Sequence, residues 1–255
     1  MSNARDVLEE LVRLSRRLGE PERDLVILGE GNTSALNDDG TFWVKGSGTQ
    51  LATIDADGFV RVDLAKALDV AKKRSLTDDE VSKALEGAKV DPSVARRPSV
   101  ETILHALALD EEGISFVGHT HPVAVNAIMC SAAAPEIFGG RLFPDEIVVC
   151  GPAPAYVPYV DPGPPLAVAV QEAMYRYADR WGQLPKALVM QNHGLIALGG
   201  SAKEVDNITA MFVKTCRVLA GTMAFGGPRY LTPANVRRIH TRPDELYRRR
   251  ELGQG

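Results

Sequence analysis

The sequence contains few cysteines for its length. Of its 255 residues only three are cysteine, Cys130, Cys150 and Cys216, and they stand far apart. An odd number at such wide spacing does not fit a disulfide framework or a cysteine-rich zinc site. Buried, reduced thiols are the better interpretation.

Long apolar runs and an excess of basic residues are also lacking. No apolar segment reaches about 18 residues, and residues 1–20 form a charged amphipathic pattern without the apolar centre of a signal peptide. The formal net charge is −4, whereas nucleic-acid-binding proteins usually carry a basic face that neutralises phosphates. The sequence therefore predicts a cytoplasmic protein that binds neither membranes nor nucleic acids.

The composition that is present suits a globular protein. Hydrophobic residues make up 45% of the chain and charged residues 24%, enough for one large α/β domain or two modest ones. No repeat, low-complexity tract or linker divides the sequence. We expect one α/β domain over residues 1–225, with a mixed sheet flanked by helices, and a tail over residues 226–255 that packs at a subunit interface.

Hydrophobic periodicity and turn residues predict where the elements lie. Helices are expected at 7–18, 64–73, 78–85, 100–109, 122–129, 166–180 and 202–220. Strands are expected at 42–45, 114–117, 146–149, 187–190 and 195–198. Ser99 is expected to cap the helix that follows it, and the proline-rich residues 152–165 are expected to form an ordered loop or interface arm.

Three of the five histidines stand at the ends of apolar runs: His119, His121 and His193. On a strand, residues two apart point to the same side and lie about 6.6 Å apart, so His119 and His121 can converge on one cation. A third imidazole, His193, must come from a neighbouring strand or loop. Three nitrogen ligands leave coordination positions open, which is typical of a catalytic metal site.

Glu101 is the candidate acid or base, because it begins the helix that precedes the strand ending in the histidines. A glutamate in a first helical turn is also a common partner of the helix dipole. The nearby histidines favour the catalytic interpretation. His105, four residues later, is expected to make a core or second-layer hydrogen bond rather than to bind the metal.

Two glycine-containing loops, residues 29–34 and 45–49, form a second group of candidate functional segments. Glycines allow close backbone approach, and Asn, Ser and Thr side chains with free N–H groups can surround a phosphate or several hydroxyls. Neither loop matches a P-loop or a dinucleotide-binding motif. Tight hairpin turns are the alternative explanation.

These motifs together resemble the class II aldolase and adducin head family, which includes sugar-phosphate aldolases, a ribulose-phosphate epimerase and a methylthioribulose-phosphate dehydratase. The matching segments follow the family's order and approximate spacing within residues 5–222: Gly31–Ser34, Lys45–Gly48, Ser99–Glu101, His119–His121 and Asn192–Gly194. The resemblance implies a single three-layer domain whose central sheet is mixed and mostly antiparallel.

The resemblance also implies a role for each matched residue. His119, His121 and His193 would bind one divalent ion, usually zinc, with manganese or cobalt as alternatives. Glu101 would be the acid or base beside that ion. The residues that would bind the substrate or its phosphate are Gly31, Asn32, Ser47, Gly48 and Ser99.

The chain departs from the family pattern at two points. Val100 stands where relatives commonly carry a second serine directly before the glutamate, so one hydroxyl donor to a phosphate is missing. The family's catalytic tyrosine has no matching residue either. Phe143 lies near its expected position, and the candidate replacements are Tyr156, Tyr159, Tyr230 and Tyr247.

The resemblance predicts a metal-dependent lyase of carbohydrate metabolism, an aldolase that reversibly cleaves a ketose or ketose phosphate through a metal-stabilised enediolate. A metal-dependent epimerase, dehydratase or decarboxylase acting on a sugar-derived substrate is the alternative. The adducin heads, which are scaffolds without the metal histidines, represent a different class. Relatives usually form tetramers with active sites between subunits, so a homotetramer is expected.

Overall fold

The computed structural model describes residues 4–73, 76–244 and 247. Its helices are α1 (Ala4–Leu18), α2 (Leu64–Ala71), α3 (Asp78–Gly87), α4 (Thr102–Leu109), α5 (Val123–Met129), α6 (Pro144–Cys150), α7 (Pro164–Trp181), α8 (Ala202–Thr222) and α9 (Pro233–Thr241). Its strands are β1 (Asn32–Leu36), β2 (Thr41–Lys45), β3 (Phe59–Asp63), β4 (Phe116–Thr120), β5 (Ala155–Val157), β6 (Ala187–Met190) and β7 (Gly194–Gly199).

The strands form a mixed, mostly antiparallel sheet in the order β3-β2-β1-β4-β7-β6-β5. Every neighbouring pair is antiparallel except β5 and β6, which run parallel. The mixed sheet expected from the sequence is confirmed. The antiparallel register matters for function because it brings the end of one strand beside the start of its neighbour.

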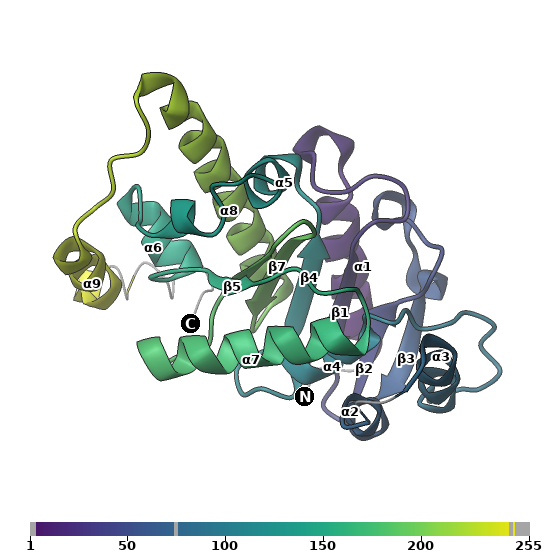
Figure 1. Cartoon of the computed structure of the whole chain (residues 1–255). Coiled ribbons are helices and arrows are strands. Elements are labelled where there is room, and N and C mark those ends of the chain that lie inside the picture. The colour runs from purple at the N-terminus through teal and green to yellow at the C-terminus, as the bar shows by residue number, and fades with distance from the viewer. Residues whose placement is uncertain (1–3, 74–75, 245–246, 248–255) are drawn as a thin grey trace.

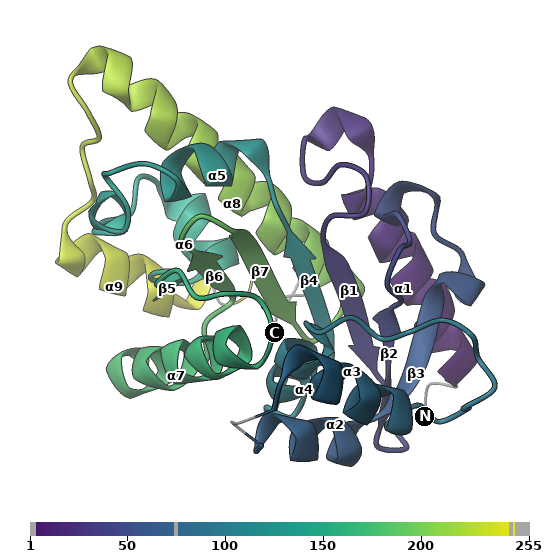
Figure 2. The same cartoon turned by 45° about the vertical axis from the view of Figure 1, so that its right-hand side comes forward.

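Helices cover both faces of this sheet (Figures 1 and 2). One buried core lies between the sheet and α2, α3, α4 and α7, and the other lies between the sheet and α1, α5, α6 and α8. Side chains alternate between the two along each strand, so Val117 of β4 enters the first core and Phe116 the second. The result is the three-layer arrangement that the sequence predicted.

Two segments of the chain differ from their expected structure. Residues 146–149 were expected to form a strand but lie in helix α6, which begins with Pro144 at its first turn and buries Ile147 and Val148. The proline-rich residues 152–165, expected as a loop, include the edge strand β5. Ser99 does not cap α4, because Glu101 occupies the N-cap position and no side chain caps that helix.

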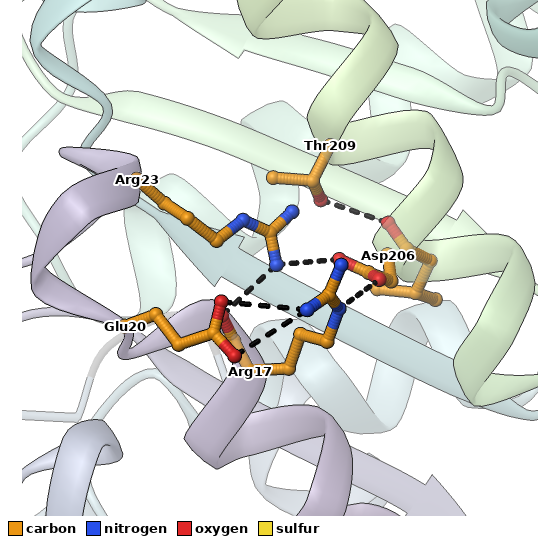
Figure 3. Close-up of polar contacts among 6 residues, drawn as sticks. Arg17, Glu20, Arg23, Asp206 and Thr209 are labelled. Atoms are coloured by element: carbon orange, nitrogen blue, oxygen red, sulfur yellow. Dashed lines mark hydrogen bonds and ion pairs between the residues drawn. The ribbon is translucent and has the colours of Figure 1, made fainter.

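Helices α1 and α8 are joined by a polar cluster beneath the sheet (Figure 3). Asp206 Oδ2 of α8 accepts from Arg17 Nε at 2.9 Å, and Asp206 Oδ1 forms an ion pair with Arg23 NH1 at 2.6 Å. Glu20 Oε1 lies 3.4 Å from Arg17 NH1. Arg23 and Asp206 side chains are 16% and 20% exposed, so their ion pair is largely shielded from water. The cluster fixes the end of α1 against the start of α8.

The described part of the C-terminal tail packs on its own chain. Tyr230 donates its hydroxyl to Ile137 O at 2.5 Å, Leu231 N donates to Arg141 O at 2.8 Å, and α9 contacts α6. Arg141 itself forms a buried ion pair with Glu146. Contact with another subunit stays a prediction for this tail.

One helical segment within the described residues, Ala202–Phe225, is long and apolar enough to cross a membrane by length and composition. It consists of α8 and the short 3-10 helix that continues it, Met223–Phe225. Its apolar face packs on β4, β6 and β7 and against α5 and α6. A helix that packs in the core of a protein can have the same length and composition.

Candidate metal centre

The motifs identified in the sequence meet at one end of the central strands of the sheet. Asn32 at the start of β1 pairs with His119 near the end of β4, and His119 pairs with Ile196 of β7. Met190, the last residue of β6, pairs with Gly194, the first residue of β7. His193 lies in the tight connection between these two strands. Antiparallel pairing therefore brings the segments around positions 32, 119 and 193 together (Figure 2).

The three predicted histidines converge there. One ligating atom from each of His119, His121 and His193 lies within 4.8 Å of the other two, and the Nε2 atoms of His119 and His121 are 3.0 Å apart. The ring centroids are 4.8–5.0 Å apart, and the ring planes cross at 60–85°. Three imidazole nitrogens facing a common point are a donor set suited to zinc and to similar divalent ions.

His119 is held in the orientation that a metal ligand needs. Its Nδ1 donates to Leu195 O at 3.0 Å, which leaves the Nε2 lone pair for a cation. Burial lowers the pKa of His119 to about 4, and burial together with the neighbouring imidazoles lowers the pKa of His121 to about 4. Both rings are therefore neutral at neutral pH, which is the state that binds a metal.

Two glycines allow the site to be packed this closely. A Cβ atom on Gly194 would lie 2.4 Å from Thr120 O and 2.8 Å from His121 Cδ2. A Cβ atom on Gly31 would lie 2.6 Å from His119 O, and its φ of +67° also favours glycine. Gly31 was expected to contact substrate. In the structure, close backbone contacts at Gly31 exclude a side chain. The same holds at Gly194, for which the sequence predicts no separate role.

Glu101 stands beside the histidines, as the sequence predicted. Its Oε1 is 3.4 Å from His193 Nε2, and its Oε2 is 3.8 Å from His119 Nε2. Asn32 Nδ2 donates to Oε2 at 2.5 Å. Burial opposes the charged carboxylate, but the imidazoles and the Asn32 amide outweigh it and hold the Glu101 pKa below its usual value. A carboxylate in this position can exchange a proton with a bound substrate.

Behind Glu101 lies a second layer of buried polar groups. Asn32 Oδ1 bonds to His105 Nε2, and His105 Nδ1 lies 2.7 Å from Ser34 Oγ. His105 is completely buried, and burial lowers its pKa to about 4. The expected hydrogen-bonding role of His105 is observed. The family resemblance predicts that Asn32 binds the substrate. In the structure, however, both the Oδ1 and the Nδ2 of its amide are bonded to protein groups.

The remaining predicted substrate-binding residues lie on two adjacent loops. Gly46 forms a β-bridge with Pro98, and Ser47 N donates to Arg97 O at 2.9 Å. Ser47 and Gly48 are exposed. Ser99 Oγ is buried and has no hydrogen-bond partner among the described residues. These loops offer backbone and hydroxyl donors, but their contact with substrate stays a prediction.

Lys45 is a residue of this region that the sequence had not singled out for a role. It is only 5% exposed, and its Nζ donates to Gly29 O at 3.1 Å. Burial lowers its pKa, while the negative charge of Glu101 opposes that change. Lys45 thus ties the two glycine-containing loops together. The one signal in the sequence for the contact between Lys45 and Gly29 is a lysine at the end of an apolar strand.

The candidate aromatic residues have partners other than the three histidines or are exposed. The hydroxyls of Tyr156 and Tyr159 donate to Gln191 Oε1 at 2.8 Å and to Asp161 Oδ1 at 2.9 Å. Tyr230 bonds to a backbone carbonyl of its own chain, Phe143 lies under Lys214, and Tyr247 is exposed. Among the described residues, no tyrosine is therefore identified as catalytic.

A cavity of about 600 Å³ opens beside the histidines. His121 and Glu30 line it, with His121 Nδ1 at 3.7 Å from Glu30 Oε1. The exposed side chains of Ile27, Leu28 and Val123 form an apolar part of its wall. The site is thus accessible to a small molecule from the His121 side.

Comparison with known proteins decides the family. The model of the class II aldolase and adducin N-terminal domain matches residues 9–220. This chain belongs to the class II aldolase and adducin family. Membership supports an enzyme, and the three converging histidines agree with the metal dependence of class II aldolases.

Relatives of this family share the sequence or the fold over most of the chain. YuxG of Bacillus subtilis (strain 168), described as an uncharacterized oxidoreductase, is 29% identical over 240 residues, which cover 88% of this chain and 32% of YuxG. The chain therefore spans about a third of that relative.

Two solved structures illustrate the shared fold. The N-terminal class II aldolase domain of a conserved protein from Thermoplasma acidophilum is 28% identical with a TM-score of 0.66, covering 84% of this chain and 93% of that chain. L-fuculose 1-phosphate aldolase from Glaciozyma antarctica PI12 is 16% identical with a TM-score of 0.65, covering 100% of this chain and 94% of that chain. The second comparison shows a common fold.

Proposed function

We propose that this class II aldolase relative is a metal-dependent carbon–carbon lyase that reversibly cleaves a ketose or ketose phosphate. The observation that carries the proposal is the Glu101 carboxylate, which lies 3.4 Å from His193 Nε2 and 3.8 Å from His119 Nε2, beside three converging imidazoles. This arrangement combines a metal-binding set with a proton carrier.

His119, His121 and His193 would hold the divalent ion, which we propose to be zinc, with manganese or cobalt as alternatives. Such an ion would polarise the substrate carbonyl and stabilise the negative charge that develops when the carbon–carbon bond breaks. The chain's own contribution to the chemistry is Glu101, which would take a proton from the substrate and return it. Asn32 holds that carboxylate in place.

Gly31, Asn32, Ser47, Gly48 and Ser99 remain the proposed residues for orienting the substrate or its phosphate. The buried, unpaired Ser99 hydroxyl and the exposed Ser47–Gly48 loop favour this assignment. Asn32 would act through Glu101 rather than by direct contact, since both ends of its amide are already bonded.

Epimerisation, dehydration or decarboxylation of a sugar-derived substrate is the second candidate. The observation behind it is that the catalytic tyrosine of the family's aldolases has no matching residue at the histidines in the described part of the chain. The hydroxyls of the candidates Tyr156 and Tyr159 donate to Gln191 and Asp161. Those reactions can use the same base and metal. An adducin-like scaffold is disfavoured by the presence of all three histidines.

The test is a screen of phosphorylated and unphosphorylated ketoses and sugar acids with the zinc-, manganese- and cobalt-loaded protein. We expect aldehyde release from a ketose. His121→Ala should lose stoichiometric metal and turnover together, and Glu101→Gln should keep the metal but lose roughly 10²- to 10⁴-fold in turnover.

His240→Ala, a histidine outside the site, is the matched control and should change neither quantity. Full turnover by a metal-free protein would defeat the proposal. A chain that binds no stoichiometric divalent ion after supplementation would favour the scaffold, and carbon dioxide or water loss without aldehyde would favour the second candidate.

A further inference from the structure

A buried row of hydrogen-bonding groups leads from the protein interior to the Glu101 carboxylate. Its members are Ser34, His105, Asn32 and Glu101, linked at 2.7 Å between Ser34 and His105 and at 2.5 Å between Asn32 and Glu101. Asn32 and Ser34 are two residues apart on β1, and Glu101 and His105 are four apart at the start of α4. A spacing of two on a strand and of four on a helix puts both side chains on the same face of the element. The side chains from β1 and α4 therefore alternate along the row.

The row has a direction, which follows from what each atom can donate. Asn32 Oδ1 faces His105 and can only accept, so His105 Nε2 must carry the hydrogen. A neutral imidazole carries one N–H, so His105 Nδ1 accepts from the Ser34 hydroxyl. At the other end Asn32 Nδ2 can only donate, so Glu101 Oε2 must accept.

The two oxygens of Glu101 are therefore not equivalent. Oε2 is occupied by the Asn32 amide, whereas Oε1 faces His193 Nε2 at 3.4 Å. The interior end of the row is closed to water, since Ser34 and His105 are both completely buried. Oε1 accepts no hydrogen bond from Asn32 and is the oxygen nearer to an imidazole, so it is the better placed of the two to exchange a proton at the histidines.

We propose that Asn32 and His105 are positioning residues that keep Glu101 Oε2 as a hydrogen-bond acceptor and thereby assign the proton transfer to Oε1. The direction of the hydrogen bonds in the row follows from the structure alone, whereas their role in catalysis rests on the proposed function. Asn32 in this role acts on the substrate through Glu101.

The direction of the row can be measured without any activity. Long-range ¹H–¹⁵N correlation spectra of the zinc-loaded, histidine-labelled protein distinguish the two imidazole tautomers, and the His105 signals are those that disappear in His105→Gln. We expect hydrogen on Nε2. Hydrogen on Nδ1 would reverse every bond in the row, put a proton on Glu101 Oε2 and overturn the inference.

Kinetics test the catalytic part. Asn32→Leu should lower kcat roughly 10- to 100-fold while KM stays within about threefold and zinc content is unchanged. Asn37→Leu, a buried asparagine just beyond the other end of β1, is the matched control and should leave kcat unaltered. Equal kcat in both variants, or loss of zinc in Asn32→Leu alone, would contradict a positioning role.

His105 offers a second, conservative comparison. A glutamine at 105 can still donate to Asn32 Oδ1, so His105→Gln should retain kcat within about threefold, whereas His105→Leu should lose as much as Asn32→Leu. Equal loss in both His105 variants would overturn the inference. Wild-type protein with the expected tautomer but no cleavage of any substrate would contradict the proposed function and leave the direction of the row intact.

Discussion

At the scale of single residues, the positions of the three converging imidazoles depend on the backbone that surrounds them. Gly194 starts β7 directly after His193, and a Cβ atom at this position would lie 2.4 Å from Thr120 O and 2.8 Å from His121 Cδ2. His119 in turn is oriented by the Leu195 carbonyl, one residue further along. The first two residues of β7 thus control two of the three ligands.

Gly194→Ala should weaken zinc binding roughly 10- to 100-fold, because the added methyl group would displace Thr120 O or the His121 ring. Competition with a chromogenic chelator measures the affinity. Gly221→Ala is the matched control, since nothing lies within 4 Å of its added Cβ. Equal zinc affinity in both variants would show that β7 can shift to make room for the methyl group without moving the histidines.

His105 should make the stability of the metal-free protein depend on pH. Its pKa is about 4 when buried and about 6.5 in an unfolded chain. Between these values the unfolded state binds more protons, so the free energy of unfolding falls as the pH falls from about 6.5 towards 4.

From pH 7 to pH 5 this single group accounts for about 2 kcal/mol. Denaturant unfolding at both pH values in the presence of a chelator measures this effect. The free energy of unfolding should decrease less between pH 7 and pH 5 in His105→Gln than in wild type, by that amount. Parallel decreases would mean that His105 is already protonated in the folded protein.

The histidines and Glu101 could be located from the sequence because each stands at the end of an apolar run. The bond between Asn32 and Glu101 could not, since the residues lie 69 positions apart and their contact depends on how helix α4 packs against β1. Lys45 and its Gly29 partner likewise meet only after two loops have folded together. Sequence spacing carries no signal for such contacts.

At the scale of helices and strands, long periodic segments were predicted well and short apolar runs were not. Helices α1, α7 and α8 lie close to their expected bounds. The run at 146–149 was assigned to a strand although it is helical, because a buried four-residue apolar run fits either structure. Pro144, which favours a first helical turn, was the available signal.

The attachment of α1 to α8 makes a prediction at this scale. Asp206→Ala removes the shared partner of Arg17 and Arg23 and should lower the free energy of unfolding by about 1–2 kcal/mol, since part of the cluster is shielded from water. Asp69→Ala, which breaks an exposed ion pair with Lys72, should leave the free energy of unfolding nearly unchanged. Equal effects in urea unfolding would mean that the cluster adds nothing beyond a surface ion pair.

At the scale of the whole molecule, a bound ion should stabilise the fold that creates its site. An ion that binds only the folded chain adds about 2.7 kcal/mol at a free concentration one hundred times its Kd. Chelation should therefore lower the Tm of the zinc-loaded protein in calorimetry. His121→Ala should show no such decrease, and an identical decrease in both proteins would indicate an effect of the chelator itself.

The arrangement of subunits is a further prediction at this scale. A homotetramer is expected from the family resemblance, with the tail over residues 226–255 at an interface. The described tail residues contact α6 and residues 137–141 of their own chain, so one side of α9 is already used. Sedimentation velocity would distinguish a tetramer from a monomer.

The antiparallel pairing of β4 with β7 also has a consequence for biosynthesis. His193 follows His121 by about 70 residues, and the two meet only through strands at the middle of the sheet. A nascent chain on the ribosome therefore has no complete ion-capturing pocket until β7 has emerged. If the three imidazoles hold a divalent ion as proposed, loading comes late in maturation. A cell short of that ion would then accumulate folded but empty protein rather than incomplete chains on the ribosome.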